Sequence, residues 1–236
     1  MTHSFYTKFG KRLFDVAAAA IGLLILSPLL ALVAIAVHLT SSRPAIFRQQ
    51  RTGQFAKPFF ILKFRSMRPA PAGKGALLTA AGDPRVTPLG RLLRKTKIDE
   101  LPQLWNVLRG DMSLVGPRPE VPVYTAQYNA RQKQVLDVKP GITSPQINFD
   151  EEALMASRPD KEAFYLSDML PAKLESDLAY CRNIRFSSDL KILFGTVTQL
   201  FLRSVGLWRS NHVPATASGD SSPAAEAKPN ISCTSS

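Results

Sequence analysis

The stretch Val16–Val37, VAAAAIGLLILSPLLALVAIAV, is apolar almost throughout, with Ser27-Pro28 near its middle. About 20 apolar residues in a helix are enough to cross the hydrocarbon core of a bilayer. Proline cannot donate a backbone hydrogen bond and its ring crowds the preceding turn, so a helix through Pro28 must kink or break. The hydroxyl of Ser27 can compensate by bonding to a freed carbonyl. The stretch therefore predicts a membrane segment interrupted at Ser27-Pro28.

Basic residues flank this segment on both sides, namely Lys8, Lys11, Arg12, Arg43, Arg48, Arg51 and Lys57. Cytoplasmic ends of membrane helices are enriched in Lys and Arg, so a single crossing predicts one basic flank and one neutral flank. We therefore expect a re-entrant helical hairpin that enters from the cytoplasm, turns at Ser27-Pro28 and leaves on the same side. A kinked single span is the main alternative. A buried core helix or a cleavable signal peptide fits the length of the run less well.

The sequence of 236 residues carries a net charge of +12, and 45% of its residues are hydrophobic. The positive charge predicts acidic partners. Because the chain also has an apolar segment, the simplest explanation of the positive charge is that the protein binds anionic membrane lipids and a phosphorylated substrate. Nucleic acid is disfavoured because the sequence shows no helix-turn-helix signature, zinc-finger spacing or aromatic-rich RNA platform.

Cysteine and histidine are too sparse for a disulfide framework or a zinc site. Cys181 and Cys233 lie far apart, and the histidines at positions 3, 38 and 212 have no ligand spacing. A metal would have to be held by carboxylates, which favours Mg²⁺ or a similar hard cation.

Strand, loop and helix signals follow the membrane segment. Apolar residues on both sides of Arg51-Thr52-Gly53-Gln54 predict two short strands between Ala45 and Met67. Residues 69–84 are rich in Pro, Gly and Ala and predict a loop. Helices are expected at Pro88–Lys95, from Asp99 as N-cap to Gly110, and, with an amphipathic pattern, at Asp189–Trp208.

Two adjacent carboxylates, Asp99 and Glu100, come directly after a run of cations that begins with Arg94-Lys95. The cations can hold a diphosphate, and together with a helix N-terminus they are expected to keep the pKa of Asp99 low. An ionised carboxylate beside phosphorus can act as a nucleophile. Glu100 could hold a divalent cation that neutralises phosphate charge. The plain alternative is a helix cap with a solvated basic face.

Arg118 lies between Pro117 and Pro119. Prolines on both sides fix the backbone and hold the guanidinium in place, as recognition of a phosphate or nucleotide requires. An ordinary surface turn explains the same pattern equally well.

Five sequence motifs, in consistent order from about residue 8 to 208, closely resemble the monotopic phosphoglycosyl transferases among the bacterial sugar transferases. They are Lys11-Arg12-x-x-Asp15 before the broken apolar segment, Lys63-Phe64-Arg65-Ser66-Met67, the run from Asp99 to Val107, the run from Gly110 to Pro119, and Lys139-Pro140-Gly141-Ile142-Thr143.

The resemblance implies transfer of a sugar-1-phosphate from a nucleoside-diphosphate sugar, with UDP as the expected nucleotide, to polyprenyl (undecaprenyl) phosphate. It implies that Asp99 forms a covalent phosphosugar intermediate and that Glu100 binds Mg²⁺. It places the reaction on the cytoplasmic face of the bacterial inner membrane, at the start of surface glycan assembly. It also implies phosphate or nucleotide contacts at Arg94, Arg118, Lys63 and Arg65, an interface anchor at Lys11, Arg12 and Asp15, and a loosely assigned role for Asp189.

One departure from the family pattern is Ser144-Pro145-Gln146-Ile147, where many members have Gly-Trp-Ala-Gln. It leaves the donor sugar undetermined, and the oligomeric state is also open, a homo-oligomer included. A non-catalytic basic adaptor on the membrane is the alternative from another functional class. Direct glycosyl transfer without phosphate is a third.

These features together predict an α+β fold. We expect a mostly helical membrane-associated domain with a re-entrant N-terminal helix hairpin, a short β-hairpin and amphipathic interfacial helices. Residues 1–40 are assigned to the membrane helix and its basic anchor, 41–209 to a cytoplasmic catalytic domain, and 210–236 to a disordered tail.

Overall fold

A computed structural model of the protein describes residues 6–41, 44–69, 78–79, 81–146, 151–156 and 158–204. Its helices are α1 (Lys11–Thr40), α2 (Pro88–Thr96), α3 (Gln103–Arg109), α4 (Pro122–Thr125), α5 (Glu151–Ala156), α6 (Lys161–Phe164), α7 (Leu170–Arg182) and α8 (Phe186–Ser204). Its strands are β1 (Ile46–Thr52), β2 (Pro58–Phe64), β3 (Ser113–Val115) and β4 (Gly141–Thr143). Short helical turns are η1 (Tyr6–Gly10), η2 (Gln54–Ala56), η3 (Ile98–Glu100), η4 (Gln132–Asp137) and η5 (Tyr165–Met169).

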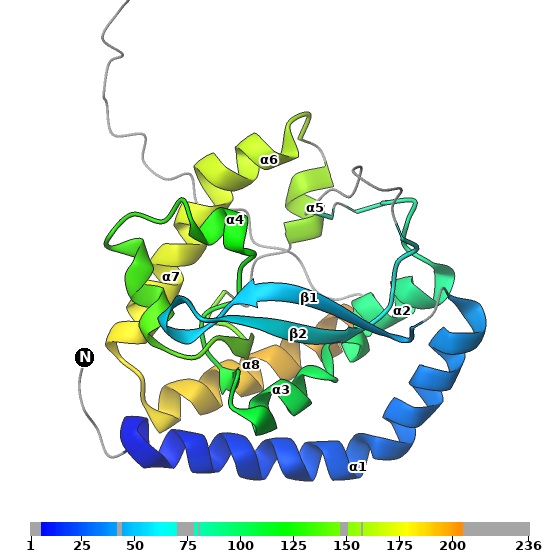
Figure 1. Cartoon of the computed structure of the whole chain (residues 1–236), viewed down its shortest axis with the longest axis horizontal. Coiled ribbons are helices and arrows are strands. Elements are labelled where there is room, and N and C mark those ends of the chain that lie inside the picture. The colour runs from blue at the N-terminus through cyan, green and yellow to red at the C-terminus, as the bar shows by residue number, and fades with distance from the viewer. Residues whose placement is uncertain are drawn as a thin grey trace, which may run out of the picture.

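The described elements form layers beside α1. Figure 1 shows α1 along one edge, α3 and α8 between it and the β1–β2 hairpin, α4 to α6 beyond the hairpin, and α7 at the side of the hairpin. Strands β1 and β2 pair antiparallel, from Ile46 opposite Phe64 to Thr52 opposite Pro58. Strands β3 and β4 pair in parallel. The predicted α+β class and the β-hairpin are therefore confirmed.

Helix α1 is one continuous helix through Pro28, not a hairpin of two separate helices. The Ser27 hydroxyl donates to the Leu24 carbonyl at 2.8 Å, as expected next to a proline. The helix bends instead of breaking, and its second part turns toward α2 (Figure 1). The prediction of a separate turn at Ser27-Pro28 is thus wrong, because the kink is absorbed within the helix. Re-entry into a membrane stays a prediction.

The bend lets the two parts of α1 pack against different clusters. Ala19 packs with Leu104 and Val107 of α3, whereas Val33 and Val37 pack with Phe64 at the end of β2 and with Leu93 of α2. The opposite side of α1 is exposed and apolar, with Leu13, Ile21, Leu24, Ile25, Leu32, Ile35 and Leu39. By length and composition, α1 is the one helix in the described ranges that could cross a membrane.

The charged residues at the start of α1 contact protein groups. Arg12 donates to the carbonyls of Val107 and Leu108 at the end of α3, at 2.6 and 2.9 Å. Asp15 accepts from the Leu114 amide at 3.0 Å, and Lys11 pairs with the buried Asp189 at 2.6 Å. These contacts fix α1 on the domain. A further role of Lys11, Arg12 and Asp15 at lipid headgroups stays a prediction.

Helix α2 confirms the helix predicted at Pro88–Lys95, and the Thr87 hydroxyl caps it by accepting from the Gly90 amide. The prediction that Asp99 caps a helix is wrong: Asp99 lies in η3, and α3 begins only at Gln103. Gly110 ends α3 in a left-handed conformation, as predicted. Helix α8 begins at Phe186. Residues 70–77 and 80 of the predicted loop and the whole predicted tail lie outside the described residues.

Candidate active site

Asp99 and Glu100 lie in η3, a single turn that joins α2 to α3. The chain reverses at Lys97, whose φ of 58° lies in the left-handed region that is unfavourable for a long side chain. This reversal directs the following carboxylates into the domain, where Asp99 is 5% and Glu100 8% exposed. Burial this deep requires compensating charges nearby.

Glu100 has two cationic partners on the same oxygen. Lys63 Nζ lies 2.8 Å from Glu100 Oε1, and an Arg118 guanidinium nitrogen lies 3.5 Å from it. Burial alone would raise the pKa of Glu100, but the cations Lys63, Lys97 and Arg118 outweigh it and hold this pKa well below its ordinary range. Glu100 is therefore ionised at neutral pH.

Asp99 has a different environment. Its Oδ1 is buried and has no hydrogen-bond partner. Burial, and next the charge of Glu100, raise the pKa of Asp99 to about 6, and the nearby cations only partly offset this. The prediction of a low pKa is wrong, because it counted the cations and a helix N-terminus but neither the burial nor the repulsion by Glu100.

Arg118 is positioned by two glycine-containing segments that lie against each other. The Gly116 amide donates to the Thr143 carbonyl at 3.0 Å, and the Gly141 amide to the Pro117 carbonyl at 2.9 Å. A Cβ on Gly141 would lie 2.1 Å from the Gly116 nitrogen, so a side chain is excluded there. The two turn motifs of the sequence thus form one support for Arg118.

The other predicted cations divide into two groups. Arg94 contacts the Met67 sulfur at 3.5 Å and is close enough to Asp99 to lower its pKa somewhat. Arg65 does not join the site: it donates to the Pro44 carbonyl at 2.8 Å, and its guanidinium lies 5.7 Å from the centre of the Phe47 ring. The structure therefore brings Lys63, Arg94 and Arg118 to the carboxylates and leaves Arg65 outside.

Comparison with known proteins shows the family of this chain. Residues 6–203 match the sequence model of the family described as bacterial sugar transferase. The chain belongs to the bacterial sugar transferase family. The matched range contains the acidic pair Asp99-Glu100 and the basic residues Lys63, Arg94 and Arg118.

Relatives of this bacterial sugar transferase differ in the donors that their names state. "Uncharacterized sugar transferase EpsL" of Bacillus subtilis is 42% identical, and the match covers 89% of this chain and 97% of that protein. The UDP-glucose:undecaprenyl-phosphate glucose-1-phosphate transferase of Caulobacter vibrioides is 40% identical, with 80% and 69% covered. The UDP-N-acetylgalactosamine-undecaprenyl-phosphate N-acetylgalactosaminephosphotransferase of Aeromonas hydrophila is 36% identical, with 80% and 43% covered.

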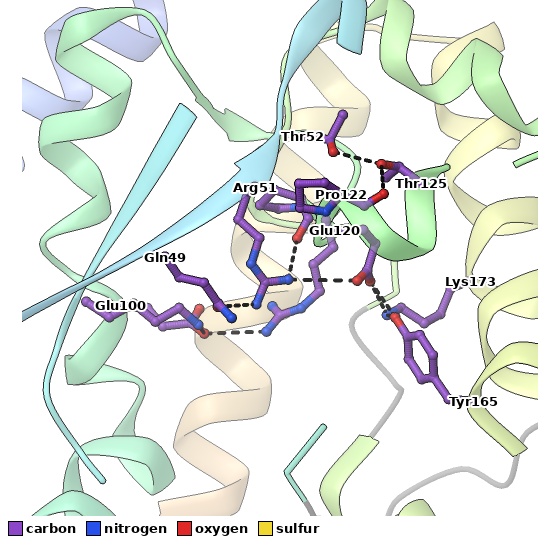
Figure 2. Close-up of polar contacts among 12 residues, drawn as sticks. Gln49, Arg51, Thr52, Glu100, Glu120, Pro122, Thr125, Tyr165 and Lys173 are labelled. Atoms are coloured by element: carbon purple, nitrogen blue, oxygen red, sulfur yellow. Dashed lines mark hydrogen bonds and ion pairs between the residues drawn. The ribbon is translucent and has the colours of Figure 1, made fainter. Parts of the chain in front are cut away.

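Sequence reasoning missed a polar network behind Arg118. Arg51 donates to the Pro119 carbonyl at 3.0 Å and lies 3.8 Å from Glu120. Glu120 accepts from Tyr165 at 2.6 Å and from Lys173 at 2.8 Å, as Figure 2 shows. The network ties the backbone next to Arg118 to η5 and α7. No local signal could have found it, because its members lie far apart in the sequence and each is of an ordinary type for a surface.

The carboxylates of the site fit a Mg²⁺ ion that is held mainly by substrate phosphates and water. They do not fit an ion that is enclosed by protein ligands alone. In the described ranges, no group of three or more His, Cys, Asp or Glu side chains could hold a metal ion. Magnesium commonly uses one or two carboxylates, with substrate phosphates and water as further ligands. The adjacent Asp99 and Glu100, with the unpartnered Oδ1 of Asp99, match that pattern.

Proposed function

We propose that the protein transfers a sugar-1-phosphate from a UDP-sugar to undecaprenyl phosphate through a covalent intermediate on Asp99, with release of UMP. The names of the relatives from Caulobacter vibrioides and Aeromonas hydrophila support the overall reaction. The single observation that carries the chemistry is the buried Asp99 Oδ1 without a partner, beside a Glu100 that cations hold ionised.

In the first step, an Asp99 carboxylate oxygen attacks the β-phosphorus of the donor. A bond forms between this oxygen and phosphorus, and the bond from phosphorus to the bridging oxygen breaks, so that UMP leaves with the electron pair. In the second step, an oxygen of undecaprenyl phosphate attacks the same phosphorus and displaces the carboxylate. Asp99 is regenerated, and the product is a sugar joined to the lipid by a diphosphate.

The cations at the site can neutralise the negative charge of the donor diphosphate. Lys63 and Arg118 already contact Glu100 and can share their positive charge with a diphosphate, and Arg94 adds a third cation near Asp99. A pKa near 6 leaves Asp99 mostly ionised at neutral pH and more basic than an ordinary aspartate. Glu100 would hold Mg²⁺ together with phosphate oxygens. The ion would supply charge neutralisation that lets one anion approach another.

We further propose that the reaction takes place at the cytoplasmic face of the bacterial inner membrane and initiates a surface glycan. The exposed apolar side of α1 supports contact with lipid. Helix α8 adds Phe194, Val197 and Phe201, which are also exposed, while Ile192 and Leu193 of the same helix pack inward. Such an amphipathic helix suits the interface plane of a bilayer. A lipid-linked sugar made there is a substrate for further glycosyl transfers.

The test is incubation of the purified full chain in lipid nanodiscs with undecaprenyl phosphate and a UDP-sugar panel. We expect UMP release, a phosphosugar adduct on Asp99 in the absence of lipid acceptor, and no turnover by Asp99→Asn. Release of UDP would favour direct glycosyl transfer. Activity of Asp99→Asn equal to that of the active, unmodified protein would leave the dyad without a catalytic role. Absence of turnover by both proteins would favour the non-catalytic adaptor.

A further inference from the structure

Lys97 is a cation beside Asp99 and Glu100 whose ammonium is not engaged by the protein. In the ranges that the structure describes, this ammonium makes no hydrogen bond and no ion pair. Lys63 and Arg118, in contrast, are both paired with Glu100. The side chain of Lys97 is half-buried, so the ammonium can still reach a ligand that enters the site.

The charge of Lys97 acts on both carboxyls of the dyad. Burial acts to raise the pKa of Asp99 and of Glu100, and nearby cations oppose this rise. Among these cations, Lys97 is second only to Lys63 at each carboxyl. Coulombic interactions weaken with distance, so the ammonium lies near the dyad although it bonds to neither acid. It is therefore placed to meet an anion that approaches Asp99.

The backbone of Lys97 has a conformation that suits other residue types better. Its φ of 58° and ψ of 15° are left-handed, at the C-terminal end of α2. Glycine or asparagine adopts this conformation at a lower cost than lysine does. An unfavourable backbone conformation next to a reactive group is a reason to look for a function of the side chain.

The segment that contains Lys97 adjoins the apolar side of the domain. Ile98, the next residue, packs against the cluster that contains Val33 and Val37 from the second part of α1. Figure 1 shows α2 beside this part of α1, and Leu92 of α2 is 57% exposed. A ligand that is anchored in lipid therefore comes to the dyad from the side on which Lys97 lies.

We propose that Lys97 binds the phosphate of undecaprenyl phosphate in the second step, when this phosphate attacks the phosphorus on Asp99. The inference rests on the proposed function. Lys63 and Arg118 are the cations assigned to the donor, so the acceptor phosphate needs a further cation as it approaches a negatively charged site. The polyprenyl chain keeps the acceptor in the lipid, whereas the UDP-sugar is soluble in water. An ammonium close to α1 thus suits the acceptor.

The test compares Lys97→Gly with the unmodified full chain in nanodiscs of phosphatidylcholine, which has no net charge. In a reaction with a covalent intermediate, kcat/KM for each substrate reports the step in which that substrate reacts. We expect kcat/KM for undecaprenyl phosphate to fall roughly tenfold or more, and that for the UDP-sugar to change less than about twofold. Assays at about pH 8 keep Asp99, with its pKa of about 6, ionised even if loss of Lys97 raises that pKa.

Three properties of the variants keep this test decisive. Glycine adopts a φ of 58° without strain, so Lys97→Gly should fold. Lys97→Arg keeps the charge and should recover most of the activity toward undecaprenyl phosphate. Arg91→Gln is the matched control, because it removes an exposed cation from α2, and it should change neither kcat/KM value.

An equal fall in both kcat/KM values, or a fall for the UDP-sugar alone, would assign Lys97 to the donor and overturn the proposal. Unchanged values in folded Lys97→Gly would overturn it as well. So would a loss that appears only when the nanodiscs contain phosphatidylglycerol, because Lys97 would then bind anionic lipid in general. Absence of UMP release by the unmodified protein would instead refute the proposed function itself.

Discussion

Lys63 Nζ lies 2.8 Å from Glu100 Oε1, at the point where the end of β2 meets η3. The pair is largely buried, with Arg118 as a second cation on the same oxygen. Glu100 is therefore ionised throughout the neutral range, and the neighbouring Asp99 is the carboxylate whose protonation changes near pH 6. The two adjacent acids thus differ in ionisation because their surroundings differ.

We expect Lys63→Met to lower kcat/KM by about 100-fold or more, because it leaves a buried carboxylate without its closest partner and removes a phosphate contact. The rate of UMP release measures this. Arg65→Met is the matched control, since Arg65 bonds to the Pro44 carbonyl away from the dyad, and it should retain most of the activity. Equal losses in the two variants would contradict the assignment of Lys63 to the site.

The rate should follow the ionisation of Asp99. Because the nucleophile must be charged and its pKa is about 6, activity should be near its plateau at neutral pH and fall below pH 6. The expected slope is about tenfold per pH unit on the acid side. Initial rates of UMP release at donor concentrations well below KM report kcat/KM and therefore the ionisation of the free enzyme. These rates, measured with a stability check at each pH, test this. A rate that stays constant down to about pH 4.5 would rule out the raised pKa.

Asp99→Asn should be inactive yet more stable. A folded pKa above the ordinary value of about 4 means that the folded state binds this proton more tightly than the unfolded state. Its stabilising effect is complete below pH 4 and is lost as pH rises toward 6, so at neutral pH the charged Asp99 is destabilising. We expect the amide to raise the free energy of unfolding by about 1–3 kcal/mol at pH 7.5. Thermal unfolding measures it, with Asp137→Asn on an exposed residue as control.

The sequence predicted which residues form the candidate site, but it did not predict how deeply they are buried. Motif order placed Asp99, Glu100, Lys63 and Arg118 together, and the structure confirms their proximity. It could not give the pKa of Asp99, because burial depends on how α2, η3 and β2 pack. Arg65 was expected at the site, but its side chain bonds to the Pro44 carbonyl instead. A sequence motif does not show in which direction each of its side chains points. The contacts of Glu120 with Tyr165 and Lys173 could not be predicted, because these three residues lie far apart in the sequence.

Asp189 of α8 is the buried partner of Lys11 at the start of α1, a contact that the sequence did not predict. Asp189 accepts from Lys11 and Tyr6 on one oxygen, each at 2.6 Å, and from Tyr180 at 2.7 Å on the other. We expect Asp189→Asn to lower the free energy of unfolding by about 3 kcal/mol, because it leaves Lys11 partly buried without a counter-charge. Denaturation in detergent micelles measures this. A change no larger than that of an exposed control such as Glu175→Gln would contradict the assignment.

The bend of α1 gives the last prediction. Because Val33 and Val37 reach Phe64 and Leu93 only after the bend, straightening the helix would separate its second part from the residues that adjoin Lys63. Pro28→Ala restores the hydrogen bond to Leu24 and favours a straight helix. We expect lower thermal stability, reduced activity, and a cysteine at Thr40 that becomes labelled from the periplasmic side by an impermeant reagent. Ser27→Ala is the control, because it removes only the 2.8 Å bond to the Leu24 carbonyl and leaves the proline in place. If Pro28→Ala behaves like Ser27→Ala in all three measurements, the packing of α1 on the domain, and not the proline, sets the bend.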